Sequence, residues 1–152
     1  MTKDEALSRV MKMCSVKEYA PSEIEQKLSE WGIEHVHIEE ILNTLIEDKF
    51  LDEARMARYF ANDKLRFNKW GKVKIKFMLR QKKLNNESIT EALAQINDLE
   101  YNTILLNELA KKRKAIKDTD DYTIRAKLMQ FAIGRGFETD LIYKAIDKLK
   151  KD

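Results

Sequence analysis

Cysteine, proline and glycine are all scarce in this sequence, and each shortage excludes a class of structure. The single cysteine, Cys14, cannot form an intrachain disulfide, and a chain without disulfides suits a reducing compartment such as the cytoplasm. One proline and four glycines are too few for the many tight turns of a β-sandwich or a β-barrel. These shortages favour an all-α protein with a cytoplasmic location.

Long apolar runs are also missing from the sequence. The uncharged apolar stretches are a few residues long, whereas a membrane-spanning helix needs roughly 20. The N-terminal sequence MTKDEALSRV contains no apolar core of the kind that signal peptides have. We therefore expect no membrane partner.

The sequence contains none of the motifs that mark common enzymes. No glycine lies in a phosphate-binding GxxxxGK[ST] or GxGxxG loop, and no Ser, Cys or Asp has a histidine partner in a catalytic pattern. On a helix, His35 and His37 would point about 200° apart, so they could share a metal ion only if His35 lay outside the helix. No further histidine or cysteine completes a coordination sphere near them. We predict a non-enzyme without a metal or a cofactor.

Abundant residues point to helices. Charged residues make up 36% of the chain and hydrophobic ones 43%, and Leu, Ile, Lys, Glu and Ala dominate. Thr2 with Glu5 and Ser22 with Glu25 each fit a capping box at a helix start. Asp52 is a good N-cap for a further helix. The resulting expectation is a chain of short amphipathic helices.

Apolar positions repeat three times with the same spacing. Steps of 4, 3, 2, 5 and 4 residues begin at Ile24, Ile75 and Leu128, and the break after the third position recurs in each copy. The third helix of each copy is expected to begin at His35, Asn86 or Thr139, and Asn and Thr are natural N-caps. We predict an all-α protein of three tandem three-helix modules, resembling helix-turn-helix units, at residues 1–51, 52–98 and 99–152. Because modules this small bury little core alone, they should pack end to end into an elongated, curved rod.

Positive charge is concentrated in the middle of the chain. Residues 1–52 carry a net charge of −6, residues 53–63 and 87–152 are each neutral, and residues 64–86 carry nine basic groups and no acidic one. An acid-free basic stretch on helices indicates an anion-binding surface, although a solvated helical face is the alternative. The predicted contact residues are Lys64, Arg66, Lys69, Lys72, Lys74, Lys76, Arg80, Lys82 and Lys83.

Two further features invite a functional interpretation. Trp70 and Gly71 precede a helix that starts at Lys72, and such a helix N-terminus could hold a phosphate or an acidic side chain. Alternatively, Trp70 is a core residue and Gly71 eases a turn. A secondary basic cluster at the end of a long helix either complements the helix dipole or forms a second contact site; it comprises Lys111, Lys112, Arg113 and Lys114.

The central sequence resembles the RecX family. FLDEARMARYF followed by KLRFNKWGKVKIKFMLRQKKL is similar to the central module of these regulators, and KLMQFAIGRGFETDLIYKAI is similar to their last module. The matching residues in the centre are Phe50, Leu51, Asp52, Arg55, Ala57, Gly71, Lys74, Ile75, Leu79, Arg80 and Lys82. The chain departs from the family pattern at Lys83-Leu84, where Gly-Ile is usual.

The resemblance implies a regulator of the RecA recombinase. Members of this family bind in the groove of the RecA filament on single-stranded DNA. They inhibit strand exchange, ATP hydrolysis and co-protease function, which affects DNA repair and the SOS response. We therefore expect a cytoplasmic monomer that binds the RecA filament and that could also contact single- or double-stranded DNA directly. The alternative hypothesis is a stand-alone nucleic-acid-binding protein of the helix-turn-helix type.

Overall fold

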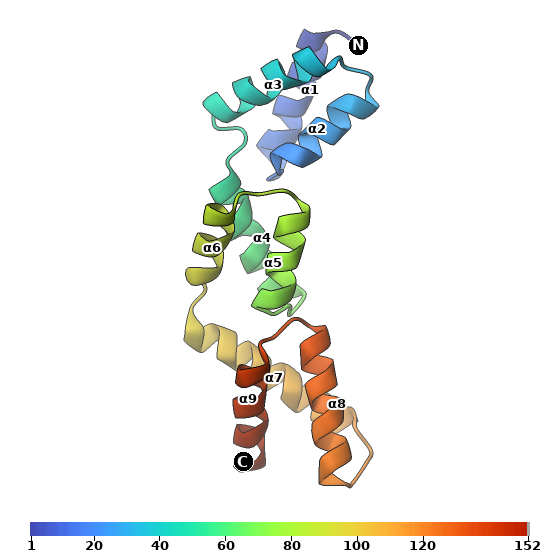
Figure 1. The fold of residues 1–152 in the computed structure, drawn as a ribbon, viewed down its shortest axis with the longest axis vertical. Coiled ribbons are helices and arrows are strands. Elements are labelled where there is room, and N and C mark those ends of the chain that lie inside the picture. Colours follow the sequence, from blue (N-terminus) through green and yellow to red (C-terminus); the bar gives the residue numbers. More distant parts are fainter. Residues whose placement is uncertain (152) are drawn as a thin grey trace. The chain divides into compact units, whose positions relative to one another are not determined.

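The computed structural model describes residues 1–151, and these contain nine α-helices and no strand (Figure 1). The helices are α1 (Lys3–Val16), α2 (Pro21–Glu30), α3 (His35–Glu47), α4 (Glu53–Phe67), α5 (Lys72–Gln81), α6 (Asn86–Ala94), α7 (Asp98–Ala115), α8 (Asp121–Gly134) and α9 (Thr139–Lys151). Along this described part, no helix is both long and apolar enough to cross a bilayer. The all-α prediction is therefore confirmed.

The chain folds into two compact units. Unit 1 combines Met1–Tyr59 with Leu79–Ala92, and unit 2 combines Phe60–Met78 with the chain from Leu93 onward. The division runs through α4 and α5, so each unit takes part of the central helices. The expected division into modules at 1–51, 52–98 and 99–152, and the expected rod, remain predictions.

The helices begin close to the positions predicted from the sequence, but three of the predicted N-cap residues are wrong. The Thr2 side chain accepts from the N–H of Glu5, and the Asp52 carboxylate accepts from the N–H of Arg55 at 2.9 Å, as predicted. Ser22 is not an N-cap, because α2 already begins at Pro21, whose fixed φ suits the first helical position. The helices α6 and α9 do begin at Asn86 and Thr139, but these two residues lie inside the helices.

The residues before those two helices take the capping role. The side chain of Asn85 accepts from the N–H of Ser88 at 2.8 Å. The carbonyl of Glu138 accepts from the N–H of Ile142 at 3.0 Å. At α2, the Glu23 carboxylate reaches back to the N–H of Ala20 at 2.8 Å. Each cap therefore lies one or two residues before the predicted one.

The structure explains the break in the repeat. One residue after the third repeat position, the backbone turns left-handed in all three copies, with φ of 79° at Gly32, 61° at Lys83 and 90° at Gly136. A left-handed residue at this place ends a helix and reverses the chain. The break thus marks the turn between the second and third helices of each copy.

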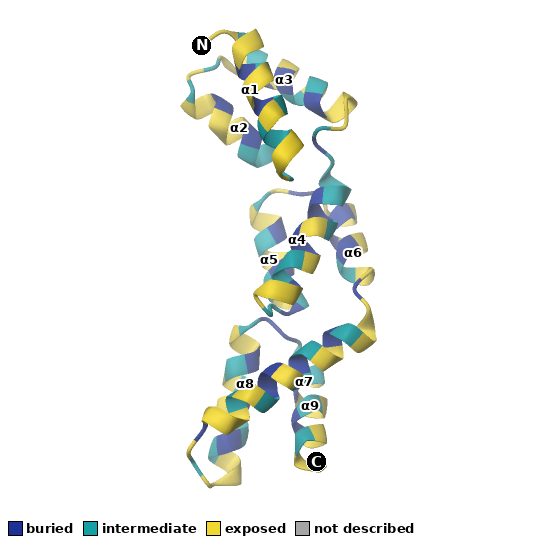
Figure 2. Ribbon diagram, turned by 180° about the vertical axis from the view of Figure 1, so that it is seen from behind, coloured by how far each residue is buried: buried dark blue, intermediate teal, exposed yellow. Residues whose placement is uncertain are grey.

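Each unit has its own apolar core. In unit 1, α1–α3 close around a cluster that includes Val10, Ile24, Leu28 and Ile41, all fully buried. In unit 2, α7, α8 and α9 pack against one another around Leu105, Leu128 and Ile142, among others. Figure 2 shows buried positions alternating with exposed ones along the helices, as amphipathic helices require.

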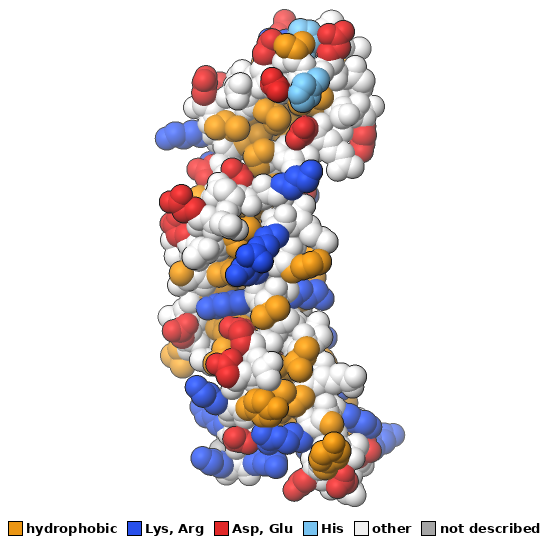
Figure 3. Space-filling model, in the orientation of Figure 1, with side chains coloured by type: hydrophobic (Ala, Val, Ile, Leu, Met, Phe, Trp, Pro, Cys, Tyr) orange, Lys and Arg blue, Asp and Glu red, His pale blue; other side chains and the backbone are white. Residues whose placement is uncertain are grey.

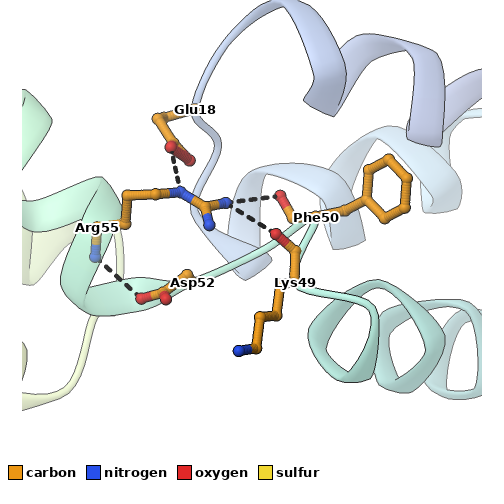
Figure 4. Close-up of polar contacts among 5 residues, drawn as sticks. All are labelled: Glu18, Lys49, Phe50, Asp52 and Arg55. Atoms are coloured by element: carbon orange, nitrogen blue, oxygen red, sulfur yellow. Dashed lines mark hydrogen bonds and ion pairs between the residues drawn. The ribbon is translucent and has the colours of Figure 1, made fainter.

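A polar joint holds the start of α4 within unit 1. The Arg55 guanidinium donates to the Glu18 carboxylate before α2, and to the carbonyls of Lys49 and Phe50 at 3.1 and 3.3 Å (Figure 4). These bonds fix the chain between α3 and α4, which Asp52 caps. We call this contact set the Arg55 joint.

Candidate functional site

The turn between α4 and α5 positions the centre of the basic stretch. At the end of α4 the Lys64 carbonyl accepts from the N–H groups of Asn68 and Trp70, each at 3.1 Å. Lys69 between them is left-handed, with φ of 58°. This tight C-terminal turn folds Trp70 back toward the last turn of α4.

Trp70 serves as a platform for two lysines. Its half-buried ring packs edge-on against Phe60 with 6.4 Å between ring centroids. The Lys64 ammonium lies 5.3 Å from the indole centroid and the Lys74 ammonium 4.5 Å. Cations over an indole face are stabilised electrostatically, so both lysines are held at the surface in defined positions. Trp70 is thus a packing residue that also orients two of the predicted contact residues.

The N-terminus of α5 is occupied by protein. The N–H of Gly71 donates to the carbonyl of Arg135 at 2.7 Å, and that of Val73 to the carbonyl of Gly136 at 2.9 Å. The N–H of Lys72 donates to the Tyr101 hydroxyl at 2.8 Å. Of the two alternatives for this helix start, the phosphate or carboxylate site is therefore wrong, because the turn after α8 and the Tyr101 hydroxyl take its donors.

Two glycines allow this close approach. A Cβ at Gly71 would lie 2.4 Å from the backbone of Gly136, and a Cβ at Gly136 would lie 2.3 Å from the Cβ of Lys74. Both contacts are closer than carbon atoms tolerate, so only glycine fits at either position without a backbone shift. We call this contact, together with Tyr101, the Gly71 joint.

Tyr101 completes the Gly71 joint as a buried polar link. Only 1% of its surface is exposed, and its hydroxyl donates to the Glu138 carboxylate while accepting from Lys72 N–H. Burial, followed by the hydrogen bond to Glu138, raises the pKa of Tyr101 well above its usual range. The Lys72 ammonium lies 5.0 Å above the tyrosine ring, so this lysine is partly committed to the joint.

The basic residues of unit 2 differ in whether they already bind other groups of the protein. The Arg66 guanidinium pairs with both oxygens of Glu100, at 2.8 and 3.4 Å, which raises the pKa of Arg66 and lowers that of Glu100. Lys69 donates to the carbonyl of Arg66. Lys76 is exposed and makes no ion pair with any residue that the structure describes. Figure 3 shows Lys and Arg side chains beside hydrophobic ones over α5.

The basic residues that belong to unit 1 divide in the same way. Lys82 pairs with Glu23 at 3.0 Å, and its carbonyl accepts from the Ser22 hydroxyl at 2.6 Å, so it holds the end of α5 to α2. Arg80 and Lys83 are exposed and form no ion pair within the described chain. The exposed positions Lys76, Arg80 and Lys83 are thus the predicted residues most available to a partner.

Two residues of the secondary basic cluster also contact other side chains of the protein. Lys111 pairs with Glu108 at 3.5 Å, and the Lys112 ammonium lies 5.5 Å from the Phe131 ring. Arg113 and Lys114 are exposed in the last turn of α7, where cations complement the helix dipole. The position of these residues fits the helix-dipole interpretation, and a second contact site stays a prediction.

Sequence reasoning missed the carboxylates that hold the basic stretch. Glu100 and Glu138 lie 34 and 37 residues from their partners Arg66 and Tyr101, and Glu23 lies 59 residues from Lys82. No local spacing signals such pairs. The weak clue was Tyr101 itself, because a buried tyrosine needs a partner for its hydroxyl.

Comparison with known proteins places the chain in a family. Two family models match: RecX, second three-helix domain, at residues 52–93, and RecX, third three-helix domain, at residues 100–146. The "Regulatory protein RecX" of Clostridium acetobutylicum is 31% identical over 148 residues, covering 95% of this chain and 68% of the relative. That of Prosthecochloris aestuarii is 29% identical over 144 residues, covering 95% and 93%.

Solved structures share the fold. The crystal structure of RecX from Lactobacillus salivarius matches 99% of this chain and 97% of its own with a TM-score of 0.90 at 20% identity. A second RecX crystal structure matches 95% of this chain with a TM-score of 0.86. The fold and its relatives define an all-α protein of the regulatory class with three-helix domains. The chain belongs to the RecX family of regulatory proteins.

Proposed function

We propose that this protein binds the RecA filament on single-stranded DNA and mainly inhibits its recombinase, ATPase and co-protease activities. It would act as a non-enzymatic monomer in the cytoplasm, in DNA repair and the SOS response. Family membership supports the regulatory role. The basic surface supports the kind of partner, because a nucleoprotein filament displays phosphate charge along its length.

The acid-free stretch on α4 and α5 carries the proposal. The nine basic residues between residues 64 and 86 have no acidic neighbour in that stretch, and the acids that pair with them come from elsewhere in the chain. Lys64 and Lys74 are oriented by Trp70, and Lys76 and Arg80 are exposed one helical turn apart on α5. A surface with several fixed cations binds phosphate mainly by releasing counterions, so its affinity should fall steeply with salt.

Filament-dependent ATP hydrolysis tests this proposal. We expect the wild-type protein to lower the RecA ATPase rate, and the K76E/R80E variant to need about tenfold more protein for the same inhibition at low salt. A matched control reverses two exposed lysines outside the basic stretch, Lys12 and Lys27, and should inhibit like the wild type. Unchanged ATPase at excess wild-type protein would refute the regulatory proposal. Equal inhibition by K76E/R80E would refute the residue assignment.

A stand-alone nucleic-acid-binding role is the second candidate. It is favoured by Phe67 and Phe77, which are 79% and 59% exposed among the basic residues and could stack on unpaired bases. Binding of a single-stranded oligonucleotide without RecA, with a steep salt dependence and a loss in F67A/F77A, would support this role. Absence of such binding at the salt concentration where the ATPase is inhibited would exclude it.

A further inference from the structure

A groove in unit 2 lies outside the basic stretch. It runs between α7 and α9 and has a volume of about 290 Å³. Each helix contributes positions i, i+3, i+4 and i+7, starting at Leu99 on α7 and at Leu141 on α9. This pattern is one face of each helix over two turns, a length of about 10 Å. The groove is therefore long enough to receive two turns of another helix.

The groove has an apolar floor and a cationic rim. Leu106, Leu141 and Ala145 are half-buried, and Leu99 at one end leaves 77% of its surface exposed. Lys144 and Lys148 are exposed one turn apart on α9, and neither forms an ion pair with the residues described. No aspartate or glutamate lines the groove.

The combination of an apolar floor with a cationic rim fits a ligand that is both apolar and acidic. A nucleic acid would neutralise the two lysines but leave the leucines uncovered. A helix with leucine-like residues on one face and carboxylates beside them would bury the floor and pair with the rim at once. We propose that the α7–α9 groove binds an acidic amphipathic helix of a partner protein. The inference is independent of the RecA proposal, because none of the groove residues belongs to the basic stretch or the secondary basic cluster.

The test uses the whole 152-residue chain and a synthetic peptide. The probe is a cross-linked helical peptide of about 20 residues with leucine at i, i+4 and i+7 and glutamate beside them. Fluorescence anisotropy should give micromolar binding, weakened about tenfold or more by L99D, because an apolar contact at the end of the groove is replaced by a carboxylate that repels the acidic peptide. The K144E/K148E variant should bind the acidic peptide more weakly to a similar extent. It should instead bind a version of the peptide that has lysine in place of glutamate.

Matched variants separate binding from folding. V16D alters another exposed apolar residue, 84% exposed on α1, and K12E/K27E reverses two lysines elsewhere; both should bind the peptide like the wild type. Circular dichroism should show the same melting temperature for L99D and the wild type, since Leu99 is exposed. No peptide binding at concentrations up to about 1 mM would overturn the proposal.

Three other results would also overturn the proposal. Equal affinity of L99D and the wild type would show that the floor is not used. Competition by a single-stranded oligonucleotide that depends on the lysines and not on Leu99 would assign the rim to nucleic acid. Concentration-dependent self-association of the protein alone, abolished by L99D, would identify a second copy as the occupant.

Discussion

The Arg55 joint and the Gly71 joint each hold the start of a helix against a distant segment of the chain, but they do so through different contacts. In unit 1, the Arg55 joint relies on an arginine side chain that is 38% exposed and whose guanidinium reaches one carboxylate and two carbonyls. In unit 2, the Gly71 joint brings backbone against backbone and seals the contact with buried Tyr101. A long charged side chain can keep its contacts when its surroundings shift slightly. A close backbone contact that depends on missing Cβ atoms cannot accommodate an added side chain. The Gly71 joint should therefore be the more sensitive to mutation and the less sensitive to salt.

The two tryptophans allow each joint to be followed separately. Trp31 belongs to unit 1 and Trp70 to unit 2, and both are half-buried. A W70F background reports the unfolding of unit 1 by fluorescence, and a W31F background reports that of unit 2. Urea titrations in both backgrounds would show whether a variant weakens its own joint or the whole chain.

The largest effect is expected from G71A. Its Cβ would meet the Gly136 backbone at 2.4 Å, so the α8–α9 turn must move and its hydrogen bonds must lengthen. We expect a loss of about 2–3 kcal/mol, measured by urea unfolding in the W31F background. G134A is the matched control, because a Cβ there meets nothing within 4 Å and alanine favours helix. Equal stability of G71A and the wild type would show that the joint is loosely packed.

A smaller effect is expected from Y101F, which removes the hydroxyl and leaves the Glu138 carboxylate and the Lys72 N–H without this partner. The cost should be about 1–2 kcal/mol in unit 2. A pH titration adds a second readout. Because folding raises the pKa of Tyr101, its contribution is complete below the unfolded value of about 10 and is lost as the pH rises above it. In Y101F this alkaline loss of stability should be reduced; an identical alkaline profile would contradict the assignment.

R55M tests the polar joint. It removes the pair with Glu18 and the bonds to Lys49 and Phe50, and should cost unit 1 about 1 kcal/mol at low salt. The difference from the wild type should shrink at high salt, in contrast to that of G71A. R58M on the same helix is the control, since Arg58 forms no ion pair within the described residues. A salt-independent loss would mean that packing, and not charge, dominates this joint.

K83G should produce the smallest effect, and it should be stabilising. Lys83 has a φ of 61°, which strains any residue with a Cβ, whereas the equivalent Gly32 and Gly136 accept the same turn without strain. We expect a gain of about 0.5–1 kcal/mol by thermal unfolding. A loss of stability would show that the Lys83 side chain makes a favourable interaction of its own.

Local signals predicted the fold well and the site less well. The three helix starts at His35, Asn86 and Thr139 followed from a spacing pattern that helix geometry imposes on nearby residues. The capping error at Ser22 arose because Pro21 competes for the first helical position. Pairings between residues far apart in the chain, such as Gly71 with Gly136, have no local pattern to reveal them.

The same limit applies to the basic stretch. Its charge was visible in the sequence, but which cations are free depends on carboxylates more than 30 residues away, such as Glu100 for Arg66. Of the nine predicted contact residues, Lys76, Arg80 and Lys83 are exposed and form no ion pair with the described residues. Whether these residues contact the filament remains a prediction.

Co-sedimentation with RecA filaments on single-stranded DNA tests the proposed role most directly. At low salt the wild-type protein and K12E/K27E should pellet with the filaments and K76E/R80E should remain largely in the supernatant. At high salt all three should remain in solution, because screening removes the phosphate contribution. Equal pelleting of K76E/R80E and the wild type at both salt concentrations would contradict a charge-based contact through α5.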